Sequence, residues 1–129
     1  MAIDIKGLCP LIQVFDMNVS LRFYCDLLCF EIVEKSAGGG WAWLRHGDAE
    51  LMLNTAYDDD DRPPTPDPAR LIGHQDTGLF IGCPDVDGAY EYLRSKGVDV
   101  SKPKLAWYGM KQMYLKDPDG FGICFQWKA

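Results

Sequence analysis

Apolar side chains recur at helical spacing in two segments of the chain, residues 16–28 and 85–96. In both segments an apolar residue returns every three or four positions, which gives a helix one face that can be buried. Each segment opens with a short acidic side chain, Asp16 or Asp85, that can accept a hydrogen bond from a free amide at the helix start. In each, a polar residue two positions later is an alternative cap. Gly97 follows the second segment and is suited to end a helix, so the pattern predicts two helices.

Strand-like runs surround both predicted helices. One run precedes each helix, and three runs follow it. The last two runs of each half form a predicted hairpin, which turns at Gly47 and Asp48 in the first half and at Pro118, Asp119 and Gly120 in the second. The expected strands are residues 9–15, 30–35 and the hairpin 41–54 in the first half, and 77–82, 98–100 and the hairpin 110–127 in the second.

The order strand, helix and three strands occurs twice, which indicates an internal repeat. Four pairs of positions superpose when the halves are aligned: Asp16 on Asp85, Leu21 on Tyr90, Cys9 on Gly78 and Met52 on Cys124. Between the halves lie four consecutive acidic residues and several prolines, and we expect a solvated linker with neither strand nor helix. The prediction is an α+β fold in one domain over residues 1–129, with module one at about 8–55, the linker at 56–76 and module two at about 77–127.

Alternate positions in the predicted strands divide into two unlike faces. One face is aliphatic or aromatic in every strand, as at Ile12 and Val14, and is expected to lie under the helices. The other face mixes small, sulfur-containing and amide side chains, which is typical of a cavity lining. Its members are Cys9, Gln13, Met52, Asn54, Gly78, Phe80, Cys124 and Gln126. The alternative is a partly exposed sheet face that binds no ligand.

The composition is that of a folded domain, with 47% apolar and 25% charged residues among 129. There are 19 Asp and Glu residues against 13 Lys and Arg, a formal charge of -6, which disfavours nucleic acids and anionic membranes as partners. The N-terminus lacks the pattern of a signal peptide, and no window approaches the roughly 20 apolar residues of a membrane span. Five cysteines without a CxxC pair indicate reduced thiols, and we expect a cytoplasmic protein.

Two motifs link the chain to a known family. The stretch D-x-x-x-S-x-x-F-Y at Asp16–Tyr24 and the turn D-P-D-G at Asp117–Gly120 resemble the glyoxalase, bleomycin resistance and extradiol dioxygenase superfamily. The resemblance runs from about Leu8 to Trp127 and implies two βαβββ modules whose curled mixed sheets enclose a ligand cleft. The family usually has Gly where this chain has Cys29, so Cys29 must take a left-handed conformation or the helix must end differently.

The resemblance also bears on metals. Metal-dependent members of the family hold the ion through His, Glu or Gln at four positions, which correspond here to Cys9, Met52, Gly78 and Cys124. None of the four offers a nitrogen or carboxylate ligand, so neither a metal nor another cofactor is expected. A soft ion such as Cu(I) on the two thiols and the thioether is one alternative. Small buried residues in place of lost ligands would give the same pattern.

No catalytic motif stands out in the sequence. It has no nucleophile elbow, HExxH, Walker or GxGxxG pattern, and His46 and His74 are expected at the surface rather than beside a thiol. The bleomycin resistance branch of the resembled family binds its drug without chemistry. This chain is similar to that branch in its missing metal set, its acidic charge and its aromatic residues near the predicted cleft.

The predicted function is therefore metal-free binding and sequestration of a flat aromatic or cationic small molecule, such as an antibiotic. Amides would orient its polar groups, while aromatic planes would stack its rings or attract its charge. The expected ligand-binding residues are Gln13, Trp41, Trp43, Met52, Asn54, Phe80, Trp107, Tyr108, Cys124 and Gln126, with no catalytic residue. Trp127 is instead expected to pack in the core or at a dimer seam.

Two other functions compete with this one. The first is a divergent enzyme of the family, a lyase or oxidoreductase with an unusual metal or none, and the second is a regulatory domain that shares only the fold. A homodimer is expected in each case, because curled half-sheets leave an open side and relatives of the resistance type close their clefts between two chains.

Metal content gives the first test. Purified protein should carry no stoichiometric Ni, Zn, Fe or Mn by elemental analysis, because the four implied ligand positions lack the side chains these ions prefer. One such ion per chain, lost when Cys9 and Cys124 are replaced by serine, would contradict the prediction.

Overall fold

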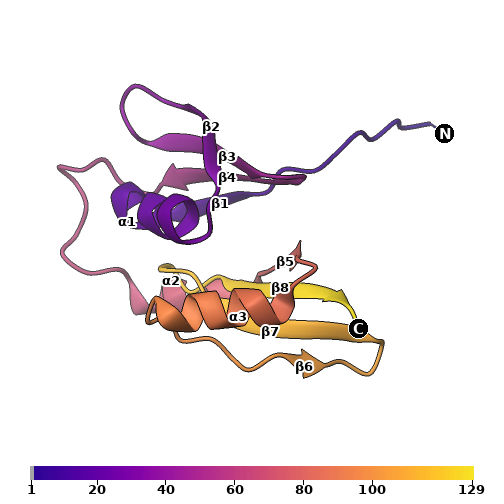
Figure 1. Cartoon of the computed structure of the whole chain (residues 1–129). Coiled ribbons are helices and arrows are strands. Elements are labelled where there is room, and N and C mark those ends of the chain that lie inside the picture. Colours follow the sequence, from indigo (N-terminus) through magenta and orange to yellow (C-terminus); the bar gives the residue numbers. More distant parts are fainter. Residues whose placement is uncertain (1) are drawn as a thin grey trace. The chain divides into compact units, whose positions relative to one another are not determined.

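The computed structural model describes residues 2–129, and the chain divides into two compact units that meet in sequence between Pro64 and Thr65. Each unit contains one four-stranded mixed sheet and its own helices (Figure 1). Both sheets have the same strand topology, which confirms an α+β fold built from two βαβββ modules.

The first unit begins with strand β1, Leu11–Val14, and helix α1, Met17–Leu21, which continues as a π-helix, η1, over Arg22–Leu27. Strands β2 (Glu31–Lys35), β3 (Trp41–His46) and β4 (Ala49–Thr55) follow. The sheet order is β1-β4-β3-β2, in which β1 runs parallel to β4 and the other pairs are antiparallel. The helix therefore carries the chain from β1 to β2 at the far edge of the sheet. The chain then returns through β3 to β4, which pairs with β1.

The second unit repeats this path. Its elements are helix α2 (Pro68–Gly73), a 3-10 turn η2 (His74–Asp76), strand β5 (Gly78–Gly82), helix α3 (Val86–Ser95), and strands β6 (Lys104–Leu105), β7 (Met110–Lys116) and β8 (Gly122–Lys128). The sheet order β5-β8-β7-β6, with β5 parallel to β8, matches that of the first unit.

The strand register confirms the predicted repeat. Leu11 pairs with Met52 in the first sheet, and Phe80 pairs with Cys124 in the second. Met52 and Cys124 therefore occupy equivalent places, as the alignment of the two halves predicts. Cys9 and Gly78 each lie two residues before the paired first-strand residue, so they also correspond.

Both helix starts are capped as predicted. The Asp16 carboxylate accepts hydrogen bonds from the backbone N–H groups of Asn18 at 3.0 Å and Val19 at 3.4 Å. The Asp85 carboxylate accepts one from Gly88 at 2.9 Å. Each cap satisfies amides that the helix itself leaves free, which fixes where the helix begins on its sheet.

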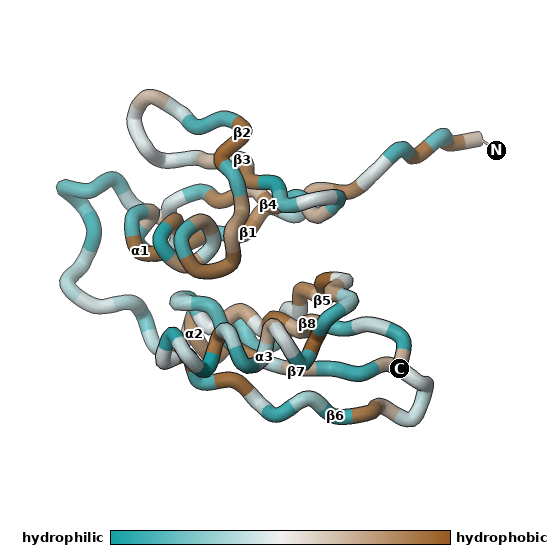
Figure 2. The backbone as a smooth tube through the Cα atoms, in the orientation of Figure 1, coloured by the Kyte–Doolittle hydropathy of each residue, from teal (hydrophilic) through white to brown (hydrophobic). Residues whose placement is uncertain are grey.

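The core lies between each sheet and its helices, on the face predicted for it. Ile12, Val14 and Leu53 of the first sheet are 5% exposed or less, while their alternating neighbours on β1 are exposed. In the second unit α3 packs on β7 and β8 and buries Leu93. Figure 2 shows apolar and polar positions interleaved along the strands of both units, and a hydrophilic stretch in the segment that joins them.

The predicted linker proves to contain a helix, so the expectation of neither strand nor helix over residues 56–76 is wrong. Helix α2 starts at Asp67, whose carboxylate accepts from the Ala69 N–H at 2.9 Å, and Pro68 stands at the first helical position. Proline is favourable there because that N–H has no partner within the helix, whereas the sequence prediction treated the prolines as breakers.

His74 is also less exposed than predicted. Its ring stacks on Phe121 with centroids 4.0 Å apart, and its Nδ1 lies 2.6 Å from the Asp119 carbonyl oxygen. The turn segment before β5 is thereby attached to the β7–β8 hairpin. His46, in contrast, is exposed as predicted.

The strand expected at residues 98–100 lies later in the chain. Pairing with β7 begins at Ser101, whose N–H donates to the Tyr114 carbonyl at 3.0 Å, but regular strand β6 forms only at Lys104–Leu105. Pro103 lies between Ser101 and β6, and because proline has no N–H it interrupts the hydrogen bonding to β7. Apolar character alone could not locate this break.

Cys29 adopts the left-handed conformation, with φ 65°, and is the one residue other than glycine with positive φ among residues 2–129. The residue after Leu28 thus takes the conformation for which glycine is favoured, and the strain is borne by a side chain with a Cβ.

Replacing Cys29 with glycine should stabilise the protein by about 1 kcal/mol, because glycine takes positive φ without that strain. Cys25→Gly in the preceding helix is the matched control and should destabilise it by about as much. Urea unfolding of the three proteins gives the comparison. A Cys29→Gly variant less stable than the parent protein would contradict the assignment of strain.

Candidate functional site

Each sheet has an open face, the one that its helix does not cover. In the first unit this face carries two cross-strand rows of three side chains, set by the strand register. One row is Leu11, Met52 and Trp43, and the other is Gln13, Asn54 and Trp41. Five of these six residues belong to the predicted ligand-binding set, and the register brings them together. Leu11, which is 52% exposed, lies on this face and was not among the predicted ligand-binding residues.

Carboxylates border the aromatic side chains of this open face. The Trp43 indole N–H donates to the Glu50 carboxylate at 3.0 Å, and Glu34 is the cross-strand partner of Trp43 on β2. Burial first, and then the Glu50 charge, raise the pKa of the Cys9 thiol. Arg45, the cross-strand partner of Glu50, lies on the same face, so two carboxylates and one guanidinium surround the indole ring and leave it one net negative charge.

Asn54 adds an unusual polar group to the same face. Among residues 2–129 its Oδ1 is buried without a hydrogen-bond partner. A buried acceptor left unpaired is unfavourable by about 1–3 kcal/mol. A hydrogen bond from a ligand donor to the Asn54 oxygen would remove this unfavourable free energy.

The open face of the second unit carries the equivalent rows: Phe80, Cys124 and Tyr114 in one, and Gly82, Gln126 and Gln112 in the other. The Gln112 amide donates to the Tyr108 hydroxyl and, at 2.9 Å, to the Gln126 carbonyl oxygen. The Tyr114 hydroxyl donates to the Gln112 carbonyl oxygen at 3.0 Å. Two amides and two phenols thus form one connected network, which holds their orientations.

The rings on this second face remain accessible. Phe80 is 55% exposed, Tyr108 51% and Tyr114 48%, and the Phe80 and Tyr114 rings meet edge to face with centroids 6.3 Å apart. Trp107 is 95% exposed and touches Tyr108 edge to face. Exposed aromatic rings beside an ordered amide network are typical of a binding surface.

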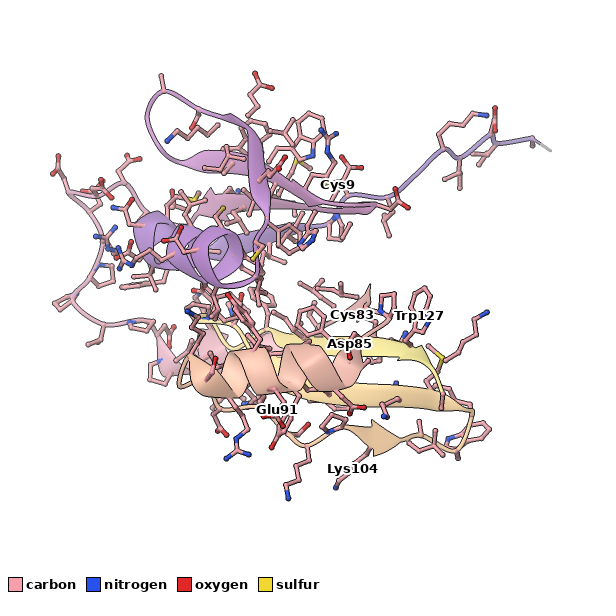
Figure 3. The ribbon with its side chains drawn as sticks, viewed as in Figure 1. Cys9, Cys83, Asp85, Glu91, Lys104 and Trp127 are labelled. Atoms are coloured by element: carbon pink, nitrogen blue, oxygen red, sulfur yellow. The ribbon has the colours of Figure 1, made fainter. Side chains whose placement is uncertain are left out.

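Trp127 does not lie in the core, so that part of its prediction is wrong, whereas a place at a dimer seam stays a prediction. Its ring is 42% exposed, and a Cβ built on Gly82 would stand 3.3 Å from it. Figure 3 shows Trp127 near Cys83, at the end of β5. The ring covers the glycine at the strand end, where no helix covers that part of the sheet.

The sequence analysis missed Gln112, Tyr114 and Glu50. Alternation along residues 110–116 would have placed the first two opposite Gln126 and Cys124, had the faces of that strand been assigned. The indole contact of Glu50 depends on side-chain geometry, for which the sequence holds no signal.

The Cys124 thiol lies under Tyr114 and is 1% exposed. Burial raises the pKa of this thiol, although its interactions with the Tyr114 side chain and the Met113 backbone lower it in part. The pKa of Tyr114 is raised in turn, by burial and by its proximity to Cys124. Both groups therefore stay protonated at neutral pH and act as polar but uncharged parts of the face.

The implied metal positions divide between the units, Cys9 and Met52 in the first and Gly78 and Cys124 in the second. Within the described part of the chain, residues 2–129, no three His, Cys, Asp or Glu side chains gather as ion ligands. The side chains at the four positions do not fit a His and carboxylate centre, and nothing in the site's chemistry requires one.

The comparisons with known proteins agree with this architecture. Residues 8–125 match the family of the Glyoxalase/Bleomycin resistance protein/Dioxygenase superfamily, and the chain belongs to that superfamily. None of the curated proteins compared with the chain matches it.

Three solved structures illustrate the shared fold. A bleomycin-binding protein complexed with bleomycin is 22% identical, with a TM-score of 0.72 over 97% of this chain and 100% of that one. A bleomycin resistance determinant encoded on the transposon Tn5 is 23% identical, with a TM-score of 0.73 over 96% and 98%. TnmS3, an antibiotic binding protein from a Streptomyces species, is 23% identical, with a TM-score of 0.71 over 100% and 99%.

The helices of residues 2–129 include none with the length and apolar character needed to cross a bilayer.

Cysteine alkylation tests the description of Cys124. At pH 7 iodoacetamide should modify the exposed Cys29 first and Cys124 last, because the buried thiol has a raised pKa and forms little thiolate. Alkylation of Cys124 should increase only as the pH rises above the ordinary range for a thiol. Peptide mapping measures both rates, and equal rates at pH 7 would contradict the buried, protonated state.

Proposed function

We propose that this protein binds a flat aromatic or cationic small molecule on its open sheet faces and sequesters it without chemistry. The observation that carries the proposal is the second open face, where accessible rings surround the ordered pair Gln112 and Gln126. The network satisfies the amide of Gln112, which is 6% exposed, and holds it in a fixed orientation among the rings.

The two features proposed for the ligand, flat rings and a positive charge, follow from the chemistry of the faces. Phe80, Tyr108 and Tyr114 offer rings for stacking, which is favourable by about 0.5–1.5 kcal/mol per contact. The amides supply hydrogen bonds without a charge. On the first face, Trp43 with Glu50 and Glu34 suits a cationic group.

Lysines lie at the borders of the second face. Lys116 and Lys128 stand in its first and last cross-strand rows, opposite Gly122 and Met110, and Lys104 of the edge strand β6 pairs with Gln112. The row of Phe80, Cys124 and Tyr114 carries no charged residue and is suited to an uncharged ring system.

The raised pKa values of the buried thiols support a binding function rather than nucleophilic catalysis by cysteine. Burial raises the pKa of Cys9, Cys25, Cys83 and Cys124, which lowers the thiolate fraction available for attack. No observation favours the lyase or oxidoreductase alternative over binding.

The shared fold of bleomycin-binding and antibiotic-binding proteins supports an antibiotic as the class of ligand to test first. A homodimer and a cytoplasmic location stay predictions. Open, partly apolar sheet faces are consistent with a second chain that covers part of them.

A thermal-shift panel that includes bleomycin, followed by calorimetry on the strongest ligand, tests the proposal. Trp41→Ala, Trp43→Ala and Tyr108→Ala should each weaken binding about three- to tenfold, the loss expected for one ring contact. Tyr92→Ala, which removes an exposed ring from α3, is the matched control and should leave affinity unchanged. A ligand that proves to be a phosphate or carboxylate anion at these faces, or unchanged affinity in all three variants, would overturn the proposal.

A further inference from the structure

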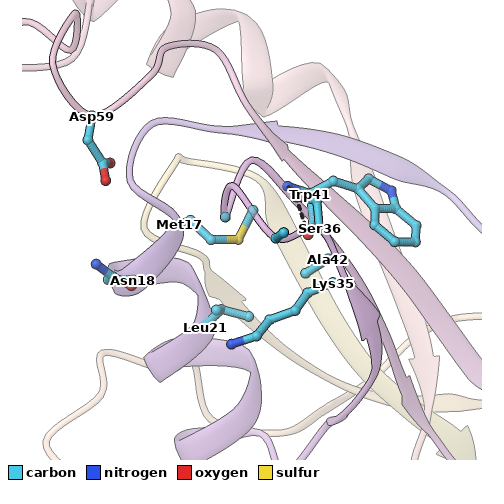
Figure 4. A pocket seen from close by; sticks show the side chains of 10 residues that line it. Met17, Asn18, Leu21, Lys35, Ser36, Trp41, Ala42 and Asp59 are labelled. Carbon is cyan, nitrogen blue, oxygen red and sulfur yellow. Dashed lines mark hydrogen bonds between the residues drawn. The ribbon is translucent and has the colours of Figure 1, made fainter.

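A separate pocket of about 150 Å³ opens on the other side of the first sheet, between α1 and the β2–β3 hairpin (Figure 4). Met17, Leu21 and Ala42 form its apolar floor. Lys35 and Ala42 are cross-strand partners on the helix-covered side, whereas Trp43 and its neighbours line the open face. The pocket therefore lies on the helix-covered side, although Trp41 of the first open face also borders it.

One wall of this pocket is formed by Ser36, Ala37 and Gly39 of the β2–β3 loop, whose side chains are small or absent. Gly38, Gly39 and Gly40 follow one another, and a Cβ on either of the first two would meet open space. The loop is fixed at its ends, because the Trp41 N–H donates to the Ser36 hydroxyl at 3.1 Å and the Thr55 N–H donates to the Gly40 carbonyl at 2.9 Å. The loop leaves room for a ligand, and its hydrogen bonds to the rest of the unit hold it in place without a bound ligand.

The charges at the mouth of the pocket are unequal. Asp59 is paired with Arg62, at 3.0 Å between Nη1 and Oδ1, and Arg62 also approaches the Asp16 carboxylate at 3.7 Å. Among residues 2–129, Lys35 forms no ion pair, and Figure 4 shows its side chain extended toward Leu21. The Asn18 amide lies at the same mouth. Arg62 is thus shared by two carboxylates, and Lys35 is the cation at this mouth without an ion-pair partner among the described residues.

We propose that this pocket binds a small monocarboxylate with a branched alkyl tail, independently of the ligand of the open faces. The carboxylate pairs with the Lys35 ammonium and accepts from the Asn18 amide, while the alkyl group lies on Met17, Leu21 and Ala42. A cavity of about 150 Å³ holds a compound of benzene size, which corresponds to about six or seven heavy atoms.

Isovalerate is a probe of that size and charge, and isovaleramide is its neutral counterpart of the same shape. In amide-resolved NMR titrations, isovalerate should shift the signals of residues 17–21 and 35–42 saturably at millimolar concentration, an affinity expected for so small a ligand. Isovaleramide should bind with an affinity at least about fivefold lower, because it has no charge to pair with an ammonium group.

Two variants and one control decide the assignment. Lys35→Gln should weaken isovalerate binding about fivefold or more and remove its preference over the amide. Ala37→Trp should fill the mouth from an exposed position and abolish binding. Lys104→Gln, an exposed lysine of the second unit, should change nothing.

Absence of shifts at 17–21 and 35–42 up to about 20 mM, a concentration beyond weak specific binding, would overturn this inference. Equal binding of isovalerate by Lys35→Gln and the parent protein would overturn it as well. Neither result bears on the open faces, because the aromatic variants and the ligand panel test those separately.

Discussion

Each sheet in this protein is covered by helices on one face only, and this constraint determines what the other face must do. The chain pairs the first strand of each unit with the last, in parallel, so the intervening helix must cross over the same side of the sheet. Strand alternation then sends every second residue away from the helix. Some of those residues, such as Leu11 and Phe80, are exposed, whereas others, such as Cys124 and Gln112, are buried. The exposed ones are not constrained by packing under a helix, so their chemistry can be set by function.

The repeat gives the two open faces the same geometry but different chemistry. Trp43 of the first unit occupies the place that Tyr114 occupies in the second, and Trp41 corresponds to Gln112. One face has become an acidic surface around an indole, and the other an amide and phenol network among exposed rings. A duplicated scaffold can thus present two different contacts to one compound or to two.

The fold was largely predictable because its signals are local. Caps at Asp16 and Asp85, the period of two along the strands and the repeated order of elements each depend on a few neighbouring residues. The missed helix at Pro68–Gly73 shows the limit, since proline favours the first position of a helix and disrupts the interior.

The residues of the site were predictable only where the alternation of side chains along one strand fixes the face on which they lie. Gln13, Met52 and Asn54 were placed on one face because the strand period fixes it, and the register brings the predicted Trp41 and Trp43 beside them. The amide network required the β7–β8 register, which arises from pairing across the sheet and not from either strand alone. Trp127 lies outside the core because no helix of its unit covers the end of its strand.

The most direct test of the account is NMR of the side-chain amides and indoles with the strongest ligand of the panel bound. We expect the largest shifts at the Gln112 and Gln126 amide groups and at the Trp43 indole N–H, since these groups lie on the open faces. Shifts confined to the helices α1 and α3, with these three signals unchanged, would contradict the claim that the uncovered sheet faces are the binding surfaces.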